Sequence, residues 1–165
     1  MSAPFTAEWN TFLAVQASAA ATLSGLVFVA VSINLTKILA IPGLPGRAAE
    51  SLMQFLQAFF VSTLMLIPGQ PQWALAHELP IAAIILWILQ VVGQIRYLRL
   101  RTGQPLSWFM PRAILAQIAN VPFLIAGIAL LLNAPGALYW LVPGFVFSFV
   151  AGILSAWVLL VEILR

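Results

Sequence analysis

The chain has 165 residues, of which 63% are hydrophobic and only 7% are charged, and its mean hydropathy is +1.07. A soluble domain carries about a quarter charged residues, so this composition excludes an ordinary water-soluble protein and indicates an integral membrane protein. The net charge of +3 comes from only seven basic residues. Most of them flank apolar segments, which is a topology signal and gives no reason to expect a nucleic-acid partner.

Five segments are apolar and long enough to cross a hydrocarbon core of about 30 Å, which takes roughly 20 helical residues. In chain order, the predicted spans run from residue 9 or 12 to 35, then 48–67, 79–98, 113–132 and 138–164. Proline and glycine mark the short connections, for example Pro45 and Gly46 in the first and Pro71 in the second. Continuous apolar runs lack the alternation of barrel strands, so we expect an all-α, single-domain transmembrane bundle.

The basic residues predict how the bundle is oriented. Lys37 and Arg47 lie in the first connection, four arginines surround the third, and Arg165 ends the sequence. The N-terminal tail and the second and fourth connections have no basic residue. Under the positive-inside rule, the N-terminus lies outside and the C-terminus lies in the cytoplasm, as five spans require.

The first predicted helix carries a stripe of small residues. Ala17, Ala21 and Gly25 recur at four-residue spacing, and Ala14, Ser18 and Thr22 lie on an adjoining face. In lipid, small side chains let helix backbones approach closely enough to associate. We interpret Ala17, Ala21 and Gly25 as a helix-packing face and favour packing within one chain, with a dimer interface as the alternative.

Polar side chains recur inside the later spans at spacings of three and four, which places them on one face of each helix. They are Glu50, Gln54 and Gln57 in the second span, Gln90 and Gln94 in the third, and Gln117 and Asn120 in the fourth. We expect these stripes to turn inward. They form either a polar pathway for a solute or interhelical amide bonds, and the second interpretation is the more common one in membrane proteins.

Residues for catalysis or cofactor binding are scarce. The chain has no cysteine and one histidine, His77, which we place in the second connection beside Glu78. A metal or haem site needs more ligands, and no serine has a histidine within reach for a triad. Glu50 follows Arg47 closely and suits the start of a helix. We therefore expect no enzyme, no catalytic residue, no metal and no cofactor.

The most basic stretch of the sequence surrounds the third connection. Its arginines are Arg96, Arg99, Arg101 and Arg112. Clusters of this kind contact anionic lipid head groups or an acidic partner, although topological anchoring alone also explains them.

Residues 12–39 (FLAVQASAAATLSGLVFVAVSINLTKIL) and 42–50 (PGLPGRAAE) resemble a family of small, uncharacterised bacterial multi-pass inner-membrane proteins. The resemblance implies a bacterial cytoplasmic membrane and brings no active-site residues. The small-residue stripe and the absence of catalytic groups favour a non-enzymatic protein that acts through assembly, as a homo-oligomer or an accessory subunit among other membrane proteins in the lipid bilayer. The alternative is a channel or carrier for a small solute or ion through the amide-lined interior.

Overall fold

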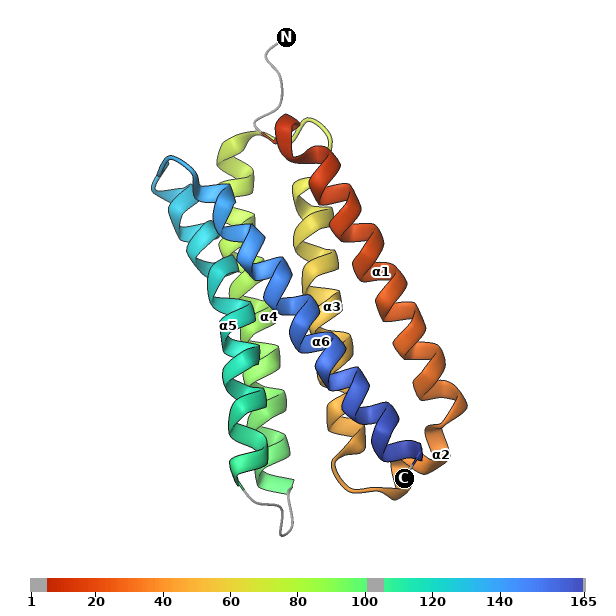
Figure 1. Ribbon diagram of the computed structural model, residues 1–165. Helices are drawn as coiled ribbons and strands as arrows, with labels where there is room; N and C mark the ends of the chain where they lie inside the picture. The colour runs from red at the N-terminus through yellow and green to blue at the C-terminus, as the bar shows by residue number, and fades with distance from the viewer. Residues whose placement is uncertain (1–5, 101–105, 165) are drawn as a thin grey trace.

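The computed structural model describes residues 6–100 and 106–164, and every regular element in this part of the chain is a helix. Five long helices run up and down along a common direction (Figure 1): α1 (Asn10–Ile33), α3 (Leu44–Met65), α4 (Gln72–Leu100), α5 (Leu106–Leu131) and α6 (Leu141–Leu164). Three short helices accompany them: η1 (Ala7–Trp9), α2 (Leu35–Ala40) and η2 (Ala137–Trp140). The prediction of an all-helical bundle is confirmed.

Within the described residues, four helical segments are long and apolar enough to cross a membrane. They are Ala7–Ile33, Gln72–Arg99, Phe109–Leu131 and Ala137–Ile163. The remaining long helix, α3, has 22 residues but is less apolar, and it packs against α1, α4 and α6. Its buried residues include Ser51, Gln54, Gln57 and Ser62. Because neighbouring helices cover these polar side chains, α3 needs less apolar surface than a helix that faces lipid on most sides.

Three helices begin earlier in the chain than the sequence predicts, and one of them is α5, which begins at Leu106 instead of residue 113. Helix α3 begins at Leu44, with Pro45 and Gly46 in its first turn. Backbone N–H groups in a first turn have no helical partner, so proline, which has no N–H, is tolerated there. Helix α4 begins at Gln72 and contains His77, so the placement of His77 in a connection is wrong. Its side chain is exposed, and Nδ1 lies 2.7 Å from the Trp73 carbonyl oxygen one turn earlier.

Helices α3 and α6 meet at a glycine. A Cβ atom added at Gly152 of α6 would lie 2.5 Å from Cε1 of Phe55 on α3. The Ser51 hydroxyl donates a hydrogen bond of 2.9 Å to the Gly152 carbonyl oxygen. Close backbone approach and interhelical hydrogen bonds of this kind hold helices together in lipid, so this crossing attaches α6 to the central helix α3.

Candidate functional site

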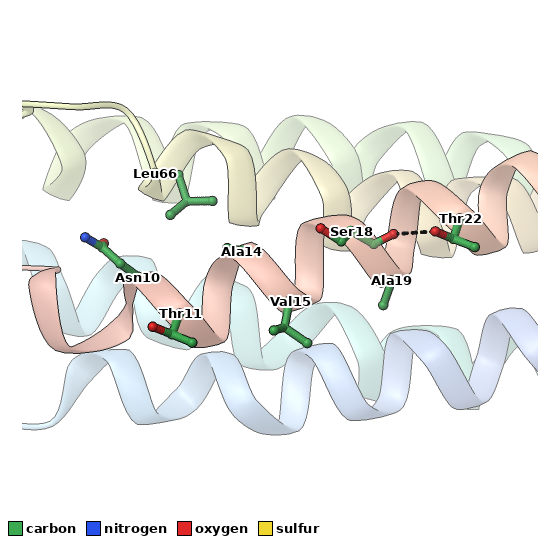
Figure 2. Close-up of a pocket in the computed structure, with 8 residues that line it drawn as sticks. All are labelled: Asn10, Thr11, Ala14, Val15, Ser18, Ala19, Thr22 and Leu66. Carbon is green, nitrogen blue, oxygen red and sulfur yellow. Dashed lines mark hydrogen bonds between the residues drawn. The ribbon is translucent and has the colours of Figure 1, made fainter.

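Helix α1 turns a face of small side chains away from the bundle, which we call the outer face of α1. It is made of exposed residues spaced three, four or seven positions apart: Ala14, Ser18, Ala21, Thr22 and Gly25. Figure 2 shows part of this face along a groove of about 740 Å³ that reaches Leu66, at the end of α3. The Thr22 hydroxyl donates to the Ser18 carbonyl oxygen at 2.8 Å, so it is satisfied inside its own helix.

The opposite side of α1 packs against α3. Its buried residues are seven positions apart: Leu13, Ala20 and Val27. Of the stripe predicted to pack within the chain, Ala17 is half-buried, whereas Ala21 and Gly25 are exposed, and a Cβ at Gly25 would meet no atom within 4 Å. Packing through Ala21 and Gly25 within the chain is therefore a wrong interpretation. The seven-residue spacing of Leu13, Ala20 and Val27 defines the face that turns inward.

Four of the seven predicted polar side chains meet between α4 and α5. The Asn120 amide donates to Gln90 Oε1, and the Gln117 amide donates to Gln94 Oε1 at 3.1 Å. Gln117 Oε1 also accepts a hydrogen bond of 2.6 Å from the Trp87 indole nitrogen. Gln90, Gln94 and Asn120 are buried. The oxygens of Gln90 and Gln94 are thus bonded across the interface, whereas their Nε2 atoms are buried and make no hydrogen bond. Amide bonds of this kind hold two helices together in lipid.

The other polar side chains surround a separate cavity of about 320 Å³ between α3, α5 and α6. Arg47, Glu50 and Gln54 enter its wall from α3, Arg112 from α5 and Ser155 from α6. Glu50 Oε2 lies 2.8 Å from Arg112 Nε, and these side chains are only 14% and 11% exposed. Although the two atoms are this close, neither of them makes a hydrogen bond. The pair is therefore an electrostatic contact. Gln57 is buried on α3 but does not line this cavity.

Aromatic rings hold the Arg112 side chain in place. Its guanidinium carbon lies 4.4 Å from the centre of the Tyr97 ring and 5.4 Å from that of Phe109. These rings stack with a centroid separation of 5.7 Å. A Cβ at Gly46 of α3 would lie 3.0 Å from Tyr97 Cδ2. The absence of a side chain at Gly46 thus lets the Tyr97 ring approach α3, and cation–π attraction places Arg112 beside Glu50.

The predicted lipid- or partner-contacting arginines do not form one surface. Arg96 and Arg99 are exposed near the end of α4, and Arg101 lies outside the described residues. Arg112 is turned into the bundle and paired with Glu50, so its assignment to a surface patch is corrected. Burial next to a carboxylate and an aromatic ring is favourable for a guanidinium group.

Sequence reasoning missed two residues of the cavity wall. Arg47 is interpreted there only as a topology signal beside Glu50, and Ser155 lies in a continuous apolar run. Serine in such a run gives no local signal, because its role depends on which helix lies opposite. The pairing of Glu50 with Arg112 joins residues of α3 and α5 that are far apart in sequence.

In residues 6–100 and 106–164, no three His, Asp or Glu side chains come together as a possible metal site. Comparisons with protein families, curated proteins and solved structures find no match to this chain.

Proposed function

We propose that this chain is a non-enzymatic, multi-pass protein of the bacterial cytoplasmic membrane and acts through assembly, with the outer face of α1 as its helix-packing surface. The observation that carries the proposal is the exposure of Ser18, Ala21, Thr22 and Gly25 on a helix that buries a different face against α3. Small residues are the usual content of interfaces between helices in lipid. A second copy of the chain is the proposed partner, and another membrane subunit is the alternative.

The proposed topology has five spans, which are the four apolar segments named above and α3. The N-terminus lies outside and the C-terminus lies in the cytoplasm. The start of α1 and the end of α6 lie at opposite ends of the bundle (Figure 1), which supports an odd number of passes. Arg47, Arg99 and Arg112 lie near the start of α3, the end of α4 and the start of α5, which all lie at one end of the bundle (Figure 1). The positive-inside rule assigns that end to the cytoplasm.

Assembly is tested by replacing each of two glycines, in separate variants, that have similar surroundings in the structure. Gly25 and Gly93 are both exposed within helices, and a Cβ at either would meet no atom within 4 Å. We expect Gly25→Leu to shift the native mass in mild detergent from oligomer to monomer, and Gly93→Leu to leave it unchanged. A wild-type chain that is monomeric and has no partner in the membrane would contradict the proposal.

A second candidate function is a channel or carrier for a small solute or ion, and the cavity beside Glu50 and Gln54 favours it. The amides of Gln90 and Gln94 accept hydrogen bonds from α5, which supports a packing role for that pair. Flux into liposomes separates the two functions. Transport predicts loss of flux in a folded Gln54→Leu variant, whereas assembly predicts no specific flux in the wild type.

A further inference from the structure

The cavity between α3, α5 and α6 has an excess of positive charge. The guanidinium groups of Arg47 and Arg112 line it, and Glu50 is the one carboxylate in its wall. The guanidinium group of Arg47 is half-buried and stays charged. Glu50 and Glu162 are the carboxylates that act on it, and Glu50 is already paired with Arg112. An anion in the cavity would add a partner for Arg47.

Hydrogen-bonding groups in the wall also lack partners. Nε and Nη2 of Arg112 and Oε1 of Gln54 are buried and make no hydrogen bond, and Gln54 is only 2% exposed. Rotation of the Gln54 amide by 180° would present its NH₂ group instead of its oxygen. Arg112, Arg47 and Gln54 together then offer several N–H donors. Guanidinium forks match the oxygens of a phosphate group better than any other side chain does.

The rest of the cavity wall is apolar and continues to the outer surface of the bundle. Leu115 and Val158 line it, and so does Leu154, which is 51% exposed. A ligand bound here would therefore have a charged group beside the arginines and an apolar part that leaves past Leu154 into the hydrocarbon. Basic pockets between membrane helices bind lipid head groups in this manner.

We propose that this cavity binds the phosphate group of an anionic phospholipid, with Arg47 and Arg112 as its charged ligands and Gln54 as a hydrogen-bond donor. The acyl chains extend along Leu154 and α6. This proposal is independent of assembly through α1, because it concerns different helices and is measured by lipid binding. Free inorganic phosphate has the same charged oxygens as the lipid phosphate group, so the experiment includes both the phospholipid and inorganic phosphate.

The test measures binding to the purified full chain in neutral detergent by native mass spectrometry, with phosphatidylglycerol, phosphatidylcholine or inorganic phosphate added. Phosphatidylglycerol is expected to bind more tightly than phosphatidylcholine. Arg47→Gln should weaken phosphatidylglycerol binding about tenfold, as expected for the loss of one charge-assisted contact. Arg96→Gln removes an exposed arginine of α4 outside the cavity and should leave binding unchanged.

A second variant tests the cavity without changing any charge. Ser155→Leu fills the cavity from α6 and should also weaken binding, with folding checked by circular dichroism and size-exclusion chromatography. If inorganic phosphate alone binds with the same dependence on Arg47, the site accepts a free anion, which supports the oxyanion site and replaces the lipid as its source. Equal weakening by Arg47→Gln and Arg96→Gln would overturn the proposal, because general surface attraction would then explain binding. Equal affinity for both lipids would overturn it as well.

Discussion

Gly127 of α5 lies directly against Pro80 of α4: a Cβ atom added at Gly127 would be 2.8 Å from the Pro80 nitrogen, Cα and Cβ. Both residues are buried inside their helices. Glycine has no side chain, so the backbone and ring of Pro80 can approach α5 closely at this position.

We expect Gly127→Ala to lower the free energy of unfolding by about 2 kcal/mol, because the clash is with the rigid backbone and ring of Pro80 and forces the helices apart. Gly93→Ala is the matched control, since Gly93 lies in α4 with open space beside it. Denaturation in mixed detergent micelles measures both. Equal stability of the two variants would show that α4 and α5 do not cross at Gly127.

Gly152→Ala should also destabilise the bundle, but this defect can be repaired. The atoms in the way belong to the Phe55 side chain, with Cε1 at 2.5 Å and Cζ at 2.7 Å from the added Cβ. Combining Gly152→Ala with Phe55→Leu should therefore recover part of the lost stability, and the same thermal or detergent denaturation checks it. Additive losses in the double variant would contradict this packing.

The amide pair between Asn120 and Gln90 predicts a coupling between α4 and α5. Asn120→Leu and Gln90→Leu should each lower stability by about 1 kcal/mol, and the double variant should lose less than the sum of the two, because each single variant leaves the other buried amide without its partner on the facing helix. Denaturation of the four proteins of this cycle measures the coupling energy. A coupling near zero would show that the amides do not bond in the membrane.

For the Glu50–Arg112 pair, we expect the single variant to be less stable than the double variant. Glu50→Leu should destabilise the protein by about 3 kcal/mol, because it leaves the guanidinium group of Arg112 buried without its carboxylate. Glu50→Leu combined with Arg112→Leu should be closer to the wild type, since no buried charge is left unpaired. Denaturation of these two variants and the wild type measures the difference, and a double variant less stable than Glu50→Leu would contradict the prediction.

Reporter fusions test the proposed topology. Tags placed before α1 and after α6 should report opposite compartments, with the C-terminal tag in the cytoplasm, because the arginines near the start of α3 and α5 stay on that side. A tag inserted between α4 and α5 should share the compartment of the C-terminal tag. Two termini in one compartment would contradict a five-span arrangement.

Much of the architecture follows from local sequence. Apolar runs of spanning length predict the helices, because a backbone in hydrocarbon has to satisfy its own hydrogen bonds. The spacing of Gln54 from Gln57 and of Gln90 from Gln94 predicts shared faces, because a helix repeats every 3.6 residues. Helix ends were less predictable: α3, α4 and α5 begin four, seven and seven residues before the expected positions 48, 79 and 113. An apolar run marks only the part of a helix that suits hydrocarbon, and the helical backbone can continue beyond it.

Tertiary structure decided which of these local features matter and with which partner. Gly25 and Gly127 are both glycines in apolar helices, yet one faces open space and the other a proline backbone. In the sequence, Arg47 is the basic residue near Glu50, whereas in the fold Glu50 pairs with Arg112. Periodicity determines which side chains share a face of one helix. The rotation and crossing of the helices determine what that face meets, and they depend on close contacts between segments far apart in the chain.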